Sequence, residues 1–284
     1  MHQPSELILT PRGTIYHLDL HPEQLADTII TVGDPKRVGM VSRHFERITD
    51  RAEHREFVTH TGELNGRRLT VISTGIGTDN IDIVFNELDA LANIDFDTRT
   101  NKERHRKLRF VRLGTSGALR AELPLDSFLV SRFALGLDGL MNFYLNYQHP
   151  PGLAESFRSA TDYPLPVYGA AAAPSLVELF SREMQPGITL TCPGFYAPQG
   201  RSLRGGTILD ADFFKQIRAV SFQHTPITNF EMETAGILGL ARHLGHEAVS
   251  CSVLLANRIT GNFSSEPGRA VERLIDVALA RLIE

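Results

Sequence analysis

The stretch TIITVGDPKR, residues 28–37, decides the fold class of this 284-residue chain. Its first five residues have the pattern of a buried strand, Gly33 and Asp34 end that strand, and Pro35 suits the first turn of a helix. Similar strand and helix patterns alternate from there to the C-terminus without a Pro/Ser/Gly-rich linker. The sequence therefore predicts one α/β domain over residues 1–284.

The other elements follow from the spacing of apolar and turn residues. Asn65-Gly66, the pair best suited to a type I′ turn, joins two strands of a predicted hairpin, 56–64 and 67–74. Apolar residues on one helical face predict a helix over 79–93 with Asp79 as its N-cap. The other predicted strands are 108–113, 127–133, 188–191 and 248–256, and the other predicted helices are 174–184, 211–219, 234–244 and 267–284.

Composition excludes several classes of protein. Hydrophobic residues make up 42% of the chain, enough for a sizeable core, which excludes disorder as the default state. The formal net charge of -4 is opposite to that of a general nucleic-acid binder, so we expect no nucleic-acid partner.

Cys192 and Cys251 lie in apolar surroundings and are too few for a four-cysteine zinc site, which predicts reduced core cysteines. No apolar run reaches the ~18 residues of a membrane span and the N-terminus lacks the pattern of a signal peptide, so we expect a soluble, cytoplasmic protein without membrane contact.

One segment looks inserted. Residues 97–107, DTRTNKERHRK, are polar and charge-dense and lie between a predicted helix and a predicted strand. Their basic side chains could contact RNA or a membrane surface. The net negative charge of the whole chain instead favours a solvated loop or a helix extension. We therefore expect an inserted polar loop.

Two glycine-rich stretches follow predicted strands. GIGTDN, residues 75–80, partly matches a dinucleotide-binding fingerprint, but Asn80 replaces the third glycine, which favours a tight strand-to-helix turn over NAD binding. RLGTSG, residues 112–117, predicts a second turn, whose N–H groups, hydroxyl and arginine can receive a small anion. Arg37, one turn into the helix after Gly33, can lean over the first loop. Two such strand ends predict one shared anion site, although each arginine alone could be an ordinary surface residue.

An acidic pair stands at the strand-to-helix transition of residues 229–236. The start of the helix rotates the second side chain relative to the first, so Glu231 and Glu233 are expected to have different roles. A carboxylate can accept hydrogen bonds from the two neighbouring hydroxyls of a sugar diol. Electrostatic support of the helix N-terminus is an equally open role for these glutamates.

Six segments together resemble a known family. In chain order they are GDPKRV (33–38), HREF (54–57), STGIG (73–77), RLGTSGAL (112–119), FYAPQGR (195–201) and NFEMETAGILGLA (229–241). They resemble the uridine phosphorylases of the nucleoside phosphorylase-I family, over a region from about Thr14 to the C-terminal helix. The resemblance implies a three-layer α/β/α fold with a mixed, partly barrel-like central sheet. It also implies a pentosyltransferase of pyrimidine salvage that converts uridine and inorganic phosphate reversibly to uracil and ribose 1-phosphate, with a site shared between the subunits of a homodimer.

The resemblance implies roles for individual residues. Those implied for phosphate are Gly33, Arg37, Arg112, Thr115 and, from the neighbouring subunit, Arg55. Those implied for ribose are Met232, Glu233 and, from the N-terminal segment 1–20 of the neighbouring subunit, His17, while Glu231 is expected to be structural. Those implied for uracil are Phe195, Gln199 and Arg201. Arg112, Gln199, Arg201 and Glu233 would carry catalysis by holding phosphate, the departing base and the sugar.

The same resemblance implies no metal and no organic cofactor. A monovalent cation near Glu56 is left open, because residues 78–80 replace the usual Gly-Pro-Ser segment of the family. Asn257 stands where related purine phosphorylases have an aspartic acid that donates a proton, and an amide cannot act as a general acid. A purine nucleoside phosphorylase or nucleosidase of the same fold, and a non-catalytic nucleoside-binding protein, remain the alternatives.

Overall fold

The strand predicted at 28–32 stands inside a large mixed sheet in the computed structural model, which describes residues 1–284. The strands are β1 (Thr28–Val32), β2 (Arg47–His54), β3 (Phe57–Leu64), β4 (Arg67–Ser73), β5 (Ile94–Asp95), β6 (Thr100–Asn101), β7 (Arg109–Ala118), β8 (Phe128–Gly136), β9 (Tyr168–Ala171), β10 (Gln185–Thr191), β11 (Ser221–Phe222), β12 (Thr225–Glu231), β13 (Glu247–Asn257) and β14 (Asn262–Phe263). The helices are α1 (Pro35–Ser42), α2 (Thr78–Asn93), α3 (Leu153–Arg158), α4 (Pro174–Phe180), α5 (Ala211–Ala219), α6 (Thr234–His243) and α7 (Pro267–Ile283).

The main sheet has the strand order β11-β12-β10-β8-β13-β7-β1-β4-β3-β2. β1 pairs in parallel with β4 and β7, whereas β13 pairs antiparallel with β8. β12 also pairs antiparallel with the end of β7, where Phe230 lies opposite Gly117. This pairing closes β7, β13, β8, β10 and β12 into a barrel and leaves β1 to β4 as an open sheet, so the predicted mixed, partly barrel-like sheet is confirmed.

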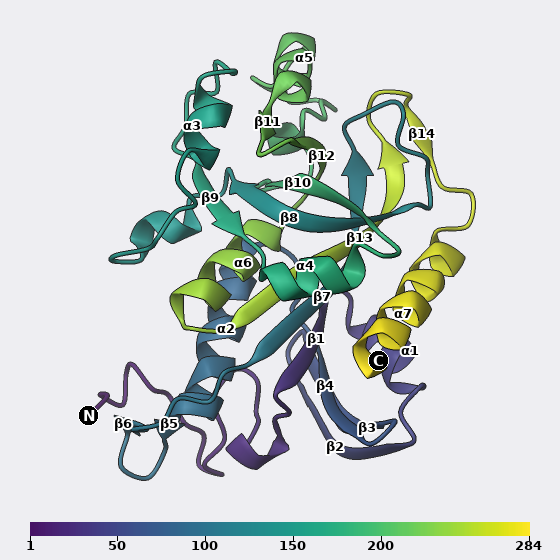
Figure 1. Cartoon of the computed structure of the whole chain (residues 1–284). Helices are drawn as coiled ribbons and strands as arrows, with labels where there is room; N and C mark the ends of the chain where they lie inside the picture. Colours follow the sequence, from purple (N-terminus) through teal and green to yellow (C-terminus); the bar gives the residue numbers. More distant parts are fainter.

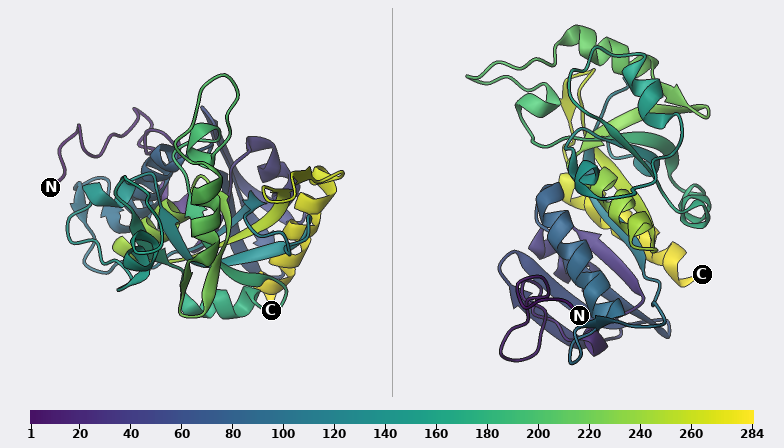
Figure 2. Two further views of the ribbon diagram at one scale, coloured as in Figure 1. Left: turned by 90° about the horizontal axis from the view of Figure 1, so that it is seen from above. Right: turned by 90° about the vertical axis from the view of Figure 1, so that its left-hand side faces the viewer.

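Helices cover both faces of this sheet (Figure 1). α2 and α6 pack against each other on one side, where α6 also contacts β8, β10 and β13, and α1 and α7 pack together on the other side. The right-hand view of Figure 2 shows the barrel at one end of the molecule and the open sheet at the other. One hydrophobic core lies between the sheet and these helices, and a second fills the barrel end beneath α3 and α5.

Most local predictions are confirmed. The hairpin turn has Asn65 and Gly66 at φ values of 49° and 70°, as a type I′ turn requires. Gly75 and Gly77, at φ values of 70° and 94°, form the predicted tight turn before α2. Cys192 and Cys251 are buried and unpaired with each other. None of the helices is both long and apolar enough to span a bilayer.

Three local predictions need correction, and one strand was not predicted. The turn predicted at 114–117 is wrong, because β7 continues to Ala118 with its glycines inside the strand. The N-cap of α2 is Gly77 rather than Asp79, which lies in the first turn. The strand at 47–54 went unpredicted because its residues are polar and half exposed at the sheet edge. The inserted segment 97–107 is not only a loop, since its Thr100–Asn101 pairs with Ile94–Asp95 in a small hairpin.

Candidate active site

A cavity of about 590 Å³ opens where the carboxyl ends of β1, β4, β12 and β13 and the later half of β7 meet. Ligands of α/β proteins commonly bind at this edge of the sheet. The cavity is lined by Gly33, Asp34, Pro35, Arg37, Gly75, Ile76, Arg112, Thr115, Ser116, Gly117, Phe195, Gln199, Arg201, Phe230, Glu231, Met232, Glu233, Leu255, Ala256 and Phe263. It therefore brings together residues that are more than 200 positions apart in the sequence.

Nearly all the residues singled out from the sequence line this cavity. They are Gly33, Arg37, Arg112, Thr115, Phe195, Gln199, Arg201, Met232 and Glu233. Of the residues assigned to phosphate, ribose or uracil, the two that do not line the cavity are His17 and Arg55, which are expected to act in a neighbouring subunit.

Arg112 and Arg37 form the cationic end of the cavity. Arg112 is buried, and its Nη2 lies 2.5 Å from Glu233 Oε2 and 3.0 Å from Glu231 Oε2. Burial alone would lower the pKa of Arg112, but these two carboxylates outweigh it and raise the pKa. Burial, followed by the nearby charge of Arg112, lowers the pKa of Arg37. Two guanidiniums this close repel each other, so an anion bound between them would stabilise both.

The two carboxylates have different partners. Glu231 accepts hydrogen bonds from the backbone N–H groups of Glu233 and Thr234 and from the Thr191 hydroxyl, so it fixes the start of α6. Glu233 accepts from the Gly77 N–H at 2.8 Å and faces the cavity beside Arg112. Burial raises the pKa of Glu233 despite that arginine. Support of the helix start thus belongs to Glu231, while Glu233 is available to a ligand.

Gln199 and Arg201 form a second polar group in the cavity lining. Arg201 Nη1 donates to Gln199 Oε1 at 2.5 Å and to the Phe195 carbonyl at 2.7 Å. The guanidinium lies 3.8 Å from the Phe195 ring centre and 5.6 Å from that of Phe230, a cation–π arrangement on two rings. Burial, and then the charge of Arg258, lowers the pKa of Arg201. Because Arg201 holds the Gln199 oxygen, the Gln199 NH₂ remains to donate to a ligand.

His17 and Arg55 share a different surface. His17 Nδ1 lies 2.6 Å from Glu87 Oε1 on α2, and the His17 carbonyl accepts from His54 Nδ1 at 2.9 Å. Arg55 follows His54 directly, in the exposed turn between β2 and β3, at a φ of 57°. Neither side chain lines the cavity of its own chain, and His54 connects the His17 backbone to the turn that carries Arg55.

Sequence reasoning missed some residues of the cavity. Ser116 is only 8% exposed and its hydroxyl has no hydrogen-bond partner, which makes it a candidate ligand-binding group within the RLGTSG motif. Phe263 and Ile76 also line the cavity, and both side chains are exposed. No local sequence pattern predicts this position for either of them. Asn257 does not line the cavity: its amide donates to the Arg120 and Leu123 carbonyls, which makes it structural.

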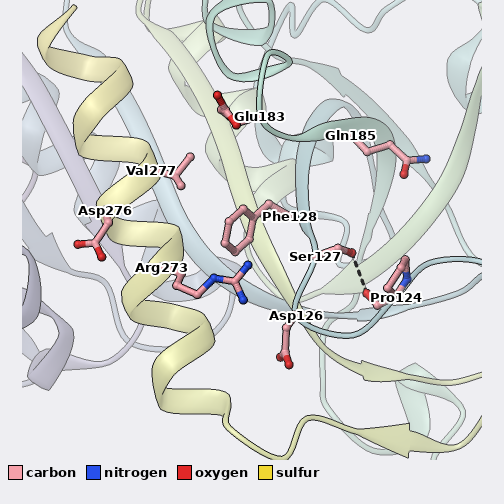
Figure 3. A pocket seen from close by; sticks show the side chains of 9 residues that line it. All are labelled: Pro124, Asp126, Ser127, Phe128, Glu183, Gln185, Arg273, Asp276 and Val277. Atoms are coloured by element: carbon pink, nitrogen blue, oxygen red, sulfur yellow. Dashed lines mark hydrogen bonds between the residues drawn. The ribbon is translucent and has the colours of Figure 1, made fainter.

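A second cavity, of about 580 Å³, lies between α7 and the start of β8 (Figure 3). Its lining includes Asp126, Glu183 and Asp276, and Arg273 stacks on the Phe128 ring at 5.5 Å. None of the residues predicted to bind a ligand lies there. The candidate chemistry of this chain is therefore concentrated in the first cavity.

Comparisons with known proteins agree with this geometry. The uridine phosphorylase of Thermococcus kodakarensis is 30% identical over 264 residues, which cover 93% of this chain and 83% of that protein. The uridine phosphorylase of Escherichia coli is 27% identical over 250 residues, 87% of each chain. The crystal structure of a Trypanosoma brucei nucleoside phosphorylase, described as showing uridine phosphorylase activity, has a TM-score of 0.89 at 27% identity and covers 98% of this chain and 99% of its own. The family model of the phosphorylase superfamily matches residues 27–283, and the chain therefore belongs to that superfamily.

Proposed function

We propose that this protein is a uridine phosphorylase, which converts uridine and inorganic phosphate reversibly to uracil and ribose 1-phosphate. The observation that carries the proposal is the cavity itself, whose lining includes Arg37, Arg112 paired with Glu233, and Arg201 hydrogen-bonded to Gln199. Phosphate, base and sugar each have matching groups there. The uridine phosphorylases among its relatives support the same substrate.

The residues divide the reaction between them. Arg37, Arg112 and Thr115, with the backbone at Gly33, hold phosphate as the nucleophile on one face of the sugar. Glu233 accepts hydrogen bonds from the two ribose hydroxyls, and Met232 packs against the ring. As the bond to the base breaks, the sugar gains oxocarbenium character, which the phosphate charge stabilises, as in glycoside cleavage.

Gln199 and Arg201 stabilise the leaving group. Negative charge grows on uracil as it departs, and Arg201, which lines the cavity beside Gln199, is the cation proposed to neutralise it. The Gln199 NH₂ donates to a carbonyl of the base, and the Phe195 and Phe230 rings keep Arg201 in place. Removing one aimed donor of this kind costs ~3–4 kcal/mol of transition-state stabilisation. The proposed reaction uses no metal and no organic cofactor.

The proposal includes a homodimer with shared sites. Arg55 of the partner subunit would supply a third guanidinium to phosphate, and His17 of the partner subunit would contact the ribose 5′-hydroxyl. Both residues lie outside their own chain's cavity, which supports a role in another copy. A cytoplasmic role in pyrimidine salvage is part of the same proposal.

A nucleoside panel with and without phosphate tests the function. We expect uracil and ribose 1-phosphate from uridine, only when phosphate is present. Free ribose formed without phosphate would indicate a nucleosidase. Faster turnover of inosine than of uridine would indicate a purine phosphorylase, and binding without turnover would indicate a nucleoside-binding protein. Each of these results would replace the proposal. Asn257 disfavours the purine reaction, because its side chain is buried, has no acidic proton and is hydrogen-bonded to backbone carbonyls of the protein.

A further inference from the structure

Three hydrogen-bond donors converge on the carboxylate of Glu87. The backbone N–H of His17 lies 3.1 Å from both of its oxygens, and the backbone N–H of Leu18 lies 3.0 Å from Oε2. The third donor is the His17 ring, whose Nδ1 is 2.6 Å from Oε1. One side chain of α2 therefore holds both the backbone and the ring of His17.

This contact decides which nitrogen of His17 carries a proton. A carboxylate can only accept hydrogen bonds, so Nδ1 must donate to it. In the neutral ring, Nε2 then has a free lone pair and acts as an acceptor. Nε2 has no partner in the chain, and the side chain is 27% exposed. The Tyr16 ring packs edge-on against the imidazole at 4.8 Å and limits its rotation.

The position of Glu87 keeps this acceptor away from the cavity of its own chain. Glu87 lies nine residues after Thr78, the first residue of α2, so the helix separates it by about 13 Å from the cavity edge near Gly77. On the same surface, His54 links the His17 carbonyl to the turn that carries Arg55. The free Nε2 therefore belongs to a partly exposed ring, in a segment that His54 links to the turn of the other residue expected to serve a second copy of the chain.

We propose that Glu87 is a positioning residue, which fixes His17 with Nε2 as an acceptor for the ribose 5′-hydroxyl in the partner subunit's cavity. The inference rests on the proposed function and assigns to it a residue that does not touch the substrate. The hydrogen bond that Nδ1 of the neutral ring donates to the carboxylate also makes Nε2 a stronger acceptor, as second-sphere carboxylates do for metal-bound histidines. A Gln at position 87 keeps the size of the side chain but can donate to Nδ1, which would move the proton to Nε2 and turn the acceptor into a donor.

The test compares uridine with 5′-deoxyuridine, which lacks the hydroxyl in question. We expect Glu87→Gln to lower kcat/KM for uridine about tenfold and to change kcat/KM for 5′-deoxyuridine less than about twofold, the difference expected for one hydrogen bond. His17→Phe should show the same pattern, and adding Glu87→Gln to His17→Phe should cost nothing further. Glu178→Gln, on an exposed helical glutamate without a side-chain hydrogen bond, is the matched control and should leave both substrates unaffected.

Nitrogen NMR of the His17 ring gives a readout that does not depend on activity. We expect an unprotonated Nε2 in the wild type and a protonated Nε2 in Glu87→Gln. Equal losses on both nucleosides, or an unchanged tautomer in the variant, would overturn the inference while leaving the proposed function intact. A wild-type protein inactive on both nucleosides would instead refute the proposed function, and with it the ribose contact assigned to His17.

Discussion

Arg112 depends on a residue that touches no ligand. Its guanidinium folds back over the backbone of Gly114, two positions along β7, to reach Glu231 and Glu233. A Cβ at position 114 would lie 1.7 Å from Arg112 Nη1 and 2.4 Å from its Cζ. The glycine is therefore needed for the arginine to reach the cavity, and not for the turn that the sequence suggested.

Gly114→Ala is expected to impair phosphate use. The added methyl displaces the Arg112 guanidinium, and loss of one aimed cation should lower kcat/KM for phosphate by about 10²- to 10³-fold. Steady-state kinetics with varied phosphate at saturating nucleoside will measure this. Gly268→Ala is the control, because a Cβ there meets nothing within 4 Å. Unchanged phosphate saturation in a folded Gly114→Ala protein would show that Arg112 does not bind phosphate.

Arg201→Ala is expected to act on the base instead. Its guanidinium contacts Gln199 and Phe195 and is not paired with a carboxylate, so it is available to a developing anion. We expect kcat/KM for uridine to fall by about 10²-fold or more, while the KM for phosphate changes little. Equal losses on both substrates in the same kinetic series would contradict the assignment of Arg201 to uracil.

At the scale of elements, the local sequence pattern predicted those strands, turns and helices that local interactions determine. The strand at 28–32, the hairpin turn at Asn65-Gly66 and the helix at 211–219 have the predicted form, because periodicity and turn residues suffice for them. The course of β7 through Gly114 and Gly117 was missed because no local pattern shows that side chains pack over these two glycines. There, Arg112 covers one glycine and the Phe230 ring lies 3.1 Å from a Cβ built on the other.

The candidate site shows the same division. Most of the cavity residues predicted from the sequence came from family motifs, which lie in or after strands that the fold brings to one edge of the sheet. Phe263 and Glu87 could not be found in this way, because only the tertiary structure brings them to the cavity or to His17. No local pattern distinguishes the glutamate that holds His17 from other exposed helical glutamates.

Asp138 links β8 to β9 and should make stability depend on pH. It follows β8 and accepts hydrogen bonds from the Tyr168 hydroxyl of β9 at 3.0 Å and from the backbone N–H of Leu140 at 2.9 Å. Burial raises the pKa of Asp138 despite these donors. In the interval between its ordinary pKa, about 4, and the raised value, the folded protein keeps a proton that the unfolded chain has lost. The contribution of Asp138 to the free energy of unfolding therefore falls as pH rises through this interval.

Asp138→Asn removes that titration. The difference in unfolding free energy, wild type minus variant, should be largest in acid and fall as the pH approaches neutrality. Urea denaturation of both proteins between about pH 4 and pH 7 will measure it, within the range where most carboxylates change charge. Asp97→Asn, an exposed position in the inserted segment, should show no such trend. A difference that stays constant with pH would contradict the assigned shift.

The inserted segment 97–107 anchors the N-terminal segment. The Arg99 side chain donates to the backbone carbonyls of His2, Gln3 and Leu7, and the His2 N–H donates to the Arg99 carbonyl at 2.7 Å. Since the N-terminal segment carries His17 further along, the insertion helps to hold the part of the chain that the proposal assigns to the partner's site.

Arg99→Ala is expected to loosen that segment without unfolding the protein. Hydrogen bonds from a charged donor are worth about 1.5–3 kcal/mol each, so cleavage by trypsin after Arg12 should become at least about tenfold faster. Mass spectrometry of the product that begins at Gly13 will follow the reaction. Arg104→Ala, in the same segment but without a side-chain hydrogen bond or ion pair, should be cleaved at the wild-type rate, and an equal rate in Arg99→Ala would contradict the anchoring role.

At the scale of the whole molecule, one chain holds an incomplete set of groups. Its cavity contains two of the three proposed phosphate-binding arginines, while Arg55 and His17 are not among the lining residues. A twofold dimer that brings these two residues of each subunit to the cavity of the other would complete both sites at once, since such an interface is the same on both partners.

Mixing two inactive variants tests this arrangement directly. Arg112→Ala and Arg55→Ala are each expected to be nearly inactive, because each removes one cation from every site of its own homodimer. In a mixed dimer, however, one of the two sites combines an intact Arg112 from one subunit with an intact Arg55 from the other. If subunits reassociate at random, half of the dimers are mixed and half of their sites are intact, so about a quarter of the wild-type activity should return. Native mass spectrometry will verify that mixed dimers form. If they form and activity does not return, both arginines serve the same chain's site and the shared arrangement is wrong.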